Sequence, residues 1–145
     1  MKKTSVPLVI AFTPDYFIPA ATCLYSIITS MQAEGELHVI CLLSEGLPER
    51  LKLKIQLIGE GRTCYSFVNL QGKLQHIYID QKYTEAASYR LLLPDLLPEY
   101  KKVIYIDCDI IVRNDLVQLY HSIDLGMNYL AAVFEASMDF QLDHL

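Results

Sequence analysis

The sequence predicts an α/β fold, a mostly parallel central sheet covered by helices, for three reasons. Short apolar runs rich in β-branched residues alternate with segments whose apolar residues recur at helical spacing, as in βαβ units with right-handed crossovers. The run Leu37–Leu43 is continuously apolar, as expected for a parallel strand buried on both faces. The 145 residues are 52% hydrophobic and 20% charged, which suits one packed domain.

The first predicted unit is the strand Val6–Phe12, followed by a helix from Phe17 or Ile18 to Gln32. Pro19 suits the first helical turn, where the N–H that proline lacks is not needed. Apolar residues recur on one face of the segment and predict the side that packs on the sheet. These residues are Ile18, Ala21, Leu24 or Tyr25, Ile28 and Met31.

The second predicted unit is the strand Leu37–Leu43 with a helix over about Pro48–Ile58, which Gly59 and Gly61 end. Beyond it, Thr84–Leu93 is expected to form a helix that Pro94 stops. A last short helix is expected to follow Asp115, which caps it. The further expected strands are Tyr65–Leu70, His76–Ile79, Val103–Ile106 and Tyr129–Phe134.

The segment after Val103–Ile106 carries the most specific chemistry, because the strand runs directly into Asp107-Cys108-Asp109. Alternate residues of an extended chain point the same way, so both carboxylates can face one cation while Cys108 turns aside. Open α/β sheets bind ligands at the carboxyl ends of their strands. A few carboxylates completed by phosphate oxygens and water are typical of Mg²⁺ and Mn²⁺ sites. The pattern therefore predicts a divalent metal site.

Composition excludes several other classes of protein. The net charge of −5, without a face rich in Lys and Arg, argues against nucleic-acid binding. No apolar run approaches the length of a transmembrane helix. No pair among Cys23, Cys41, Cys64 and Cys108 has C-x-x-C spacing, which favours reduced, buried thiols in a cytoplasmic protein over a zinc site or disulfides.

The block Ser88–Leu119, SYRLLLPDLLPEYKKVIYIDCDIIVRNDLVQL, resembles the core of family 8 glycosyltransferases. The shared pattern is an Arg on a helix, a Leu-Pro turn, a hydrophobic strand, D-x-D, an apolar triplet and an Asp-Leu. Weaker resemblance extends from Val6 to about Glu135 and includes the segment LGMNYLAAVFE.

The resemblance implies a Rossmann-like GT-A fold and a retaining transferase that moves a hexose from a nucleotide-diphosphate sugar, UDP-hexose above all. It implies Mn²⁺ or Mg²⁺ held by Asp107 and Asp109, and a saccharide or glycolipid acceptor such as lipopolysaccharide. Glu135 falls near a position that faces the acceptor in relatives. The donor-binding positions that match the family are Phe12, Thr13, Asp15, Tyr16, Arg90, Asp107, Cys108 and Asp109.

We expect residues 1–145 to form a single but incomplete GT-A domain, which lacks the acceptor-side lid at its carboxyl end. The family's third metal ligand, a His in a His-Gly-Lys-Pro type motif, has no match in the sequence. Nucleotide sugars are cytosolic, so the expected location is the cytoplasm, including the inner face of the membrane.

Two other functions remain open at this point. A truncated, non-catalytic nucleotide-binding fragment would expose apolar surface and self-associate. A haloacid-dehalogenase-type phosphatase also begins with a strand and D-x-D, although it needs Thr or Val where Ile111 stands and the motif on its first strand. Arg90 could instead pair with Glu85 or Asp95 on a solvated face, and Tyr89 and Tyr105 are expected to be packing residues.

Overall fold

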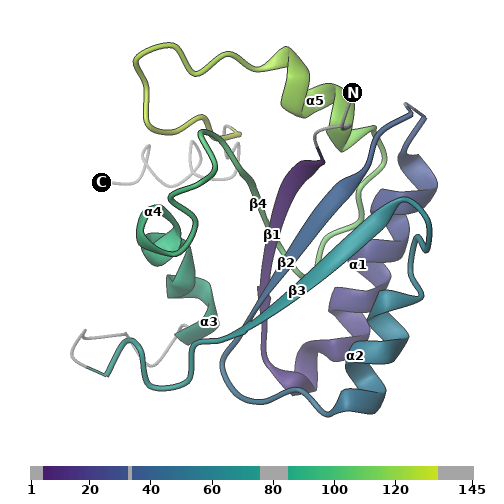
Figure 1. Ribbon diagram of the computed structural model, residues 1–145, viewed down its shortest axis with the longest axis vertical. Helices are drawn as coiled ribbons and strands as arrows, with labels where there is room; N and C mark the ends of the chain where they lie inside the picture. The colour runs from purple at the N-terminus through teal and green to yellow at the C-terminus, as the bar shows by residue number, and fades with distance from the viewer. Residues whose placement is uncertain (1–4, 33, 76–84, 134–145) are drawn as a thin grey trace, which may run out of the picture.

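The computed structural model describes residues 5–32, 34–75 and 85–133, and it confirms the α/β class. Its strands form one parallel sheet in the order β3-β2-β1-β4 (Figure 1). The strands are β1 (Val6–Phe12), β2 (Leu37–Leu43), β3 (Thr63–Asn69) and β4 (Ile104–Asp107). The α-helices are α1 (Phe17–Ser30), α2 (Glu49–Gln56), α3 (Glu85–Ser88), α4 (Leu93–Leu96) and α5 (Leu116–Ser122). Two 3₁₀ helices, Pro14–Tyr16 and Tyr89–Leu92, precede α1 and α4.

The order of the strands contains one reversal. The chain moves outward from β1 to β2 and β3 through α1 and α2, then returns past both strands to place β4 on the other side of β1. Such a reversal leaves a crevice at the carboxyl ends of the two diverging strands, which is where open α/β sheets bind ligands. The reversal here lies between β1 and β4, and β4 carries the D-x-D motif.

Two apolar cores cover the two faces of the sheet. On one face, α1, α2 and α5 pack against alternate residues of β1 and β2, such as Leu8, Ile10 and Val39. On the other face, α3 and the 3₁₀ helix after it pack against Val9, Ala11 and their neighbours in β2. Figure 1 shows the two layers on opposite sides of the strands. Every residue of β1 is buried, as a strand between two layers requires.

Pro7 lies within this central strand without breaking the sheet. The N–H of Val6 donates to the carbonyl of Glu36, 2.8 Å away, so the nitrogen of the next residue faces the β4 side. The pairing of β1 with β4 begins only at Leu8. The N–H that Pro7 lacks is therefore not needed by the sheet.

The predicted apolar face of the first helix is confirmed in part: Leu24 and Met31 are buried and Ile28 packs against the core, but the face is turned away from Ile18 and Tyr25. Ile18 and Tyr25 are 68% and 64% exposed, and the helix ends at Ser30 rather than Gln32. The buried residues are Ala20, Cys23, Leu24, Ile27 and Met31. They also follow helical spacing, and the small side chains of Ala20 and Cys23 allow the helix to approach the sheet closely.

The predicted helix Thr84–Leu93 was also wrong in part. The structure has four residues of α3, a 3₁₀ turn and then α4, and Pro94 lies in the first turn of α4 instead of ending a helix. The second helix and the third strand agree with prediction to within two residues at each end. The expected strand His76–Ile79 lies outside the described residues.

The expected strand Tyr129–Phe134 does not form over residues 129–133, which have no regular secondary structure and are exposed. β-Branched and aromatic residues form a strand only where a neighbouring strand accepts them. Phe134 lies outside the described residues. No helix in the described ranges 5–32, 34–75 and 85–133 is long and apolar enough to cross a membrane.

Two glycines after α2 offer a matched test of this packing. Gly59 has φ of +72°, and a Cβ there would lie 2.8 Å from Ile28 Cδ1 on α1; Gly61 has φ of +84° with open space around it. We expect Gly61→Ala to cost about 1 kcal/mol of stability from backbone strain alone. Gly59→Ala should cost roughly 1–3 kcal/mol more, because it also overpacks the contact between α1 and α2. Urea unfolding measures both, and equal losses would contradict the close packing.

Candidate functional site

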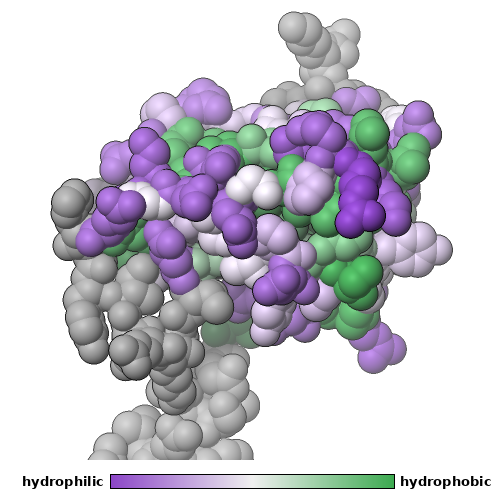
Figure 2. All heavy atoms as spheres, turned by 90° about the horizontal axis from the view of Figure 1, so that it is seen from below, coloured by the Kyte–Doolittle hydropathy of each residue, from purple (hydrophilic) through white to green (hydrophobic). Residues whose placement is uncertain are grey.

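A cavity of about 400 Å³ lies at the carboxyl ends of β1 and β4, where the strand order reverses. Figure 2 looks onto this end of the sheet, where hydrophilic and hydrophobic residues are interspersed on the surface. A volume of this size is in the usual range for small-molecule sites. Three segments line the cavity: the end of β1 with the turn after it, α3 with the following 3₁₀ helix, and the end of β4. The lining residues are Ala11, Phe12, Thr13, Tyr16, Ala86, Ala87, Arg90, Tyr105, Asp107, Cys108 and Asp109.

All three residues of the D-x-D motif line this cavity. The prediction that Cys108 turns aside was wrong, because the strand ends at Asp107 and residues 108–109 form a turn. Asp107 is the last residue of β4 and stands level with Ala11 of β1 in the register. Two residues further along each chain, Asp109 and Thr13 also reach the cavity. Parallel pairing therefore places the acidic end of β4 beside the polar turn that follows β1.

Arg90 supplies the positive charge at this cavity. Its Nε donates to the carbonyl of Ala87 at 2.7 Å, and its Nη2 donates to Asp107 Oδ1 at 3.4 Å. The guanidinium carbon lies 5.0 Å from the centre of the Tyr105 ring. The alternative pairing of Arg90 with Glu85 or Asp95 is wrong, because the short 3₁₀ helix directs the side chain toward β4 instead.

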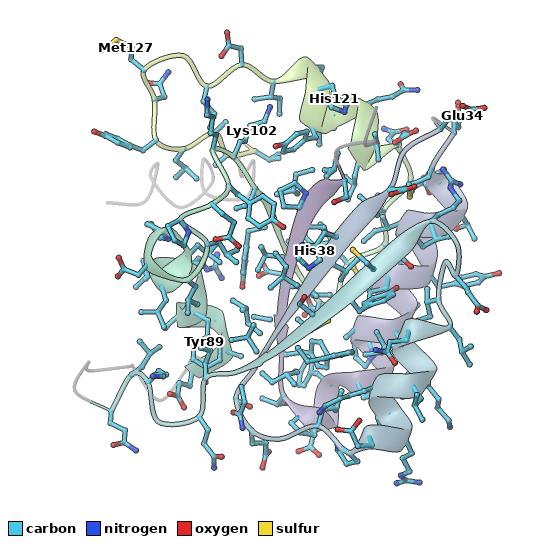
Figure 3. All side chains as sticks on the ribbon, in the orientation of Figure 1. Glu34, His38, Tyr89, Lys102, His121 and Met127 are labelled. Carbon is cyan, nitrogen blue, oxygen red and sulfur yellow. The ribbon has the colours of Figure 1, made fainter. Side chains whose placement is uncertain are left out.

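The two tyrosines near Arg90 differ in role. Tyr89 is fully buried, and its hydroxyl donates to the carbonyl of Leu70 at 3.4 Å, so the prediction that it packs is confirmed (Figure 3). Tyr105 also packs against the apolar core on its face of the sheet, as predicted, but it is only half-buried and lines the cavity as well. Sequence reasoning missed it as a lining residue, along with Ala11, Ala86 and Ala87. Its position two residues before Asp107, on the same side of the strand, was the available signal.

Helix α1 holds the loop that follows the D-x-D motif. The N–H of Val112 donates to Ser26 Oγ, and Ser30 Oγ donates to the carbonyl of Val112, each at 2.9 Å. The N–H of Gln32 donates to Asp115 Oδ2 at 2.8 Å. Asp115 also caps α5 through the N–H of Val117, which confirms the predicted cap. The path of the chain after Asp109 is thus fixed by polar groups at the carboxyl half of α1.

The donor atoms at the cavity suit a hard cation better than a soft one. Burial, with a smaller contribution from Asp109, raises the pKa of the Cys108 thiol. The oxygen ligands at the cavity are the carboxylates of Asp107 and Asp109, which Mg²⁺ and Mn²⁺ favour. Among the described residues no cluster of three His, Cys, Asp or Glu side chains could hold a metal. Phosphate oxygens and water would have to complete the coordination of such a cation.

The other predicted donor-binding residues divide into two groups. Phe12, Thr13 and Tyr16 line the cavity, although Phe12 is almost fully buried and serves the core as well. Asp15 is exposed and is not among the lining residues. Glu135, expected on the acceptor side, lies outside the described residues.

The cysteines are all free, in agreement with prediction. Cys23 and Cys41 are buried, and burial raises the pKa of the Cys23 thiol to about 11. Cys23 Sγ donates a weak hydrogen bond to the carbonyl of Asp107 at 3.8 Å, from beneath the site. Cys108, which was also expected to be buried, is only partly buried, and Cys64 is exposed on β3 at the edge of the sheet.

Comparisons with known proteins agree with this architecture. The family model described as "Glycosyl transferase family 8" matches residues 7–144. General stress protein A of Bacillus subtilis is 24% identical over 149 aligned residues, which cover 100% of this chain and 52% of that protein. The solved WbbM bifunctional glycosyltransferase superposes with a TM-score of 0.81 at 25% identity, over 94% of this chain and 24% of that one.

The solved galactosyltransferase LgtC, in complex with donor and acceptor sugar analogues, shares the fold at a TM-score of 0.74 and 23% identity. The alignment covers 94% of this chain and 49% of LgtC. The sheet and flanking helices are therefore those of the GT-A glycosyltransferases. The chain spans about half the length of the B. subtilis relative and of LgtC.

The hydrogen bonds between Ser26 and Ser30 of α1 and the backbone of Val112 give a testable expectation. Ser26→Ala removes the acceptor for the Val112 N–H and should cost about 1 kcal/mol of stability, the usual net value of such a hydrogen bond. Hydrogen exchange at the Val112 amide should become faster. Thr22→Ala is the control, because Thr22 is exposed and bonds only within α1, to the carbonyl of Ile18. An unchanged rate of hydrogen exchange at the Val112 amide in Ser26→Ala would show that the hydrogen bond to Ser26 does not hold the loop.

Proposed function

This chain belongs to glycosyl transferase family 8, and from that membership we propose that it forms the donor-binding part of a metal-dependent retaining hexosyltransferase. The proposed donor is UDP-hexose, with Mn²⁺ or Mg²⁺ as the cofactor. One observation carries the proposal: two carboxylates and one guanidinium face a single cavity at the reversal point of a parallel sheet. The family membership leaves the phosphatase alternative without support.

In the proposed site, Asp107 and Asp109 hold the cation through carboxylate oxygens, and the diphosphate of the donor completes its coordination. A divalent cation stabilises negative charge that develops on a departing diphosphate, acting as a Lewis acid and as a template. This chain is acidic, with a net charge of −5. A cation at the site would therefore supply positive charge that the protein surface largely lacks.

The remaining cavity residues would position the donor. Arg90 can offer two parallel N–H groups to a phosphate or sugar oxygen. Thr13 and Tyr16, in the turn after β1, provide a hydroxyl and an aromatic ring on the other side of the cavity from Arg90's helix. We assign the nucleoside to this side, because a ring 46% exposed is available for stacking on a base.

The acceptor and the location of the protein are proposed on the family alone. A saccharide or glycolipid acceptor, with Glu135 facing it, follows from the retaining hexosyltransferases that the sequence resembles. Residues 1–145 are proposed to form one GT-A domain that carries the donor half of the reaction. A cytoplasmic location, including the inner face of the membrane, is proposed because nucleotide sugars are made there.

A second candidate is a nucleotide-binding domain that self-associates without catalysis. Four large side chains near the end of the described residues are almost fully exposed: Met127 at 97%, Tyr129 at 102%, Leu130 at 78% and Val133 at 96%. Figure 3 shows Met127 on the outer part of this loop, away from the sheet. A row of exposed apolar residues favours association. Light scattering that finds a monomer at all concentrations would remove this candidate.

The donor site is tested by titrating UDP into the protein by calorimetry, with Mn²⁺ or with EDTA. We expect UDP binding to require Mn²⁺ and to weaken by roughly tenfold or more in Asp109→Ala, since a metal ligand is lost. Asp95→Ala is the matched control, because it removes a carboxylate of α4 outside the cavity and should bind UDP as the wild type does. UDP binding that is equal in EDTA and Mn²⁺ would overturn the proposed metal site.

A further inference from the structure

We propose that Arg90 and the divalent cation compete for Asp107, and that the donor diphosphate ends this competition by drawing the guanidinium to itself. Tyr105 acts as the positioning residue that keeps Arg90 within reach of both partners. The inference rests on the proposed donor site and adds to it a coupling between metal binding and nucleotide binding.

Arg90 already forms an ion pair with one of the two carboxylates, that of Asp107. Its Nη2 lies 3.4 Å from Asp107 Oδ1, whereas charge-assisted hydrogen bonds are usually about 2.7–2.9 Å long. The side chains of Arg90 and Asp107 are 47% and 58% exposed. Ion pairs this open to water are weak and easily exchanged. Arg90 therefore partly neutralises the Asp107 carboxylate but can be displaced from it.

Electrostatic repulsion between the cation and the Arg90 guanidinium makes the two compete. A divalent cation on Asp107 would lie within a few ångströms of the guanidinium, at a distance where like charges repel even in a well-solvated site. Metal and guanidinium thus cannot both hold Asp107 at full strength. A diphosphate offers the displaced guanidinium a second, bidentate anionic partner. Asp107, Asp109 and Arg90 give the cavity a net charge of −1, which a divalent cation changes to +1 and a diphosphate of charge −2 then returns to −1.

Arg90 can change partner with a small movement. Its Nε donates to the carbonyl of Ala87 at 2.7 Å, so the planar guanidinium would tilt as one rigid group about this hydrogen bond. The face of Tyr105 supports the group, 5.0 Å from guanidinium carbon to ring centre. An aromatic face attracts the cation wherever it lies above the ring.

Such an exchange makes each ligand strengthen the other. The nucleotide removes a competitor from Asp107, and so raises the affinity for metal beyond what shared coordination gives. By linkage, the metal must raise the affinity for nucleotide by the same factor.

The test measures Mn²⁺ alone and UDP with Mn²⁺ separately, on the whole chain, by electron paramagnetic resonance and calorimetry. Arg90→Ala should bind Mn²⁺ alone roughly two- to fivefold more tightly, the range expected for loss of an exposed ion pair. The same variant should bind UDP in saturating Mn²⁺ roughly tenfold more weakly. A residue with only a structural role would not move the two affinities in opposite directions. Unchanged or weaker Mn²⁺ binding by Arg90→Ala would overturn the inference.

Two further comparisons separate the mechanism from general charge effects. Arg113→Ala removes the same charge from the loop after the motif, at an exposed residue outside the cavity, and should leave both affinities unchanged. Tyr105→Leu should shift both affinities in the same directions as Arg90→Ala but less, whereas Tyr105→Phe keeps the ring and should resemble the wild type. If Arg113→Ala tightens Mn²⁺ binding as much as Arg90→Ala does, net charge explains the result and the inference fails.

Failure of the proposed function gives a different result. If the wild type binds no UDP in Mn²⁺, the donor site itself is refuted. If the wild type binds UDP with Mn²⁺ and Arg90→Ala leaves metal affinity unaltered, the donor site stands and only the exchange is refuted.

Discussion

Parallel pairing between β1 and β4 is the contact on which the site depends. It joins Ala11 to Asp107 in register, so the turn after β1 and the D-x-D loop leave the sheet at the same level. Because the chain reaches β4 only after reversing across β3 and β2, no helix of a βαβ unit fills the space between the two strand ends. The cavity is a product of topology, and its polar residues come from segments far apart in the sequence.

Helix α1 links that site to the core. One face of α1 buries Ala20, Cys23 and Ile27 against the sheet, and the neighbouring Ser26 and Ser30 bond both backbone groups of Val112. Hydrogen bonds between rigid elements hold a loop more precisely than its own sequence can, since they restrict backbone dihedrals that water would leave free. At the other end of β4, Lys102 reinforces the frame by donating to the carbonyls of Tyr120 and Ile123 at the end of α5 (Figure 3).

The charges at the cavity are arranged for exchange rather than for stability. Both members of the Arg90–Asp107 pair are about half exposed, and the pair adds little to folding. The more buried ionisable groups include the Cys41 thiol and the Tyr65 phenol, and burial raises the pKa of each to about 12. The carboxylate of Asp115 is also buried, and the N–H groups of Gln32 and Val117 donate to it. Charged side chains that stay in contact with water can pair with a ligand at a small cost in free energy, because no buried charge is left without a partner.

The sequence by itself determined the fold class, the family, the four strands of the sheet and the pair of acidic residues at the end of β4. The fold class, the strands and the acidic pair follow from continuous apolar runs and residue spacing within single segments, whereas the family follows from the resemblance of the block Ser88–Leu119. Only the tertiary structure decided that α1 turns Ala20 and Cys23 rather than Ile18 and Tyr25 to the sheet, because two apolar stripes compete and the loop at Val112 favours one. It also decided that Arg90 meets Asp107 and Tyr105, and that residues 129–133 stay unpaired, because partners distant in the chain settle both.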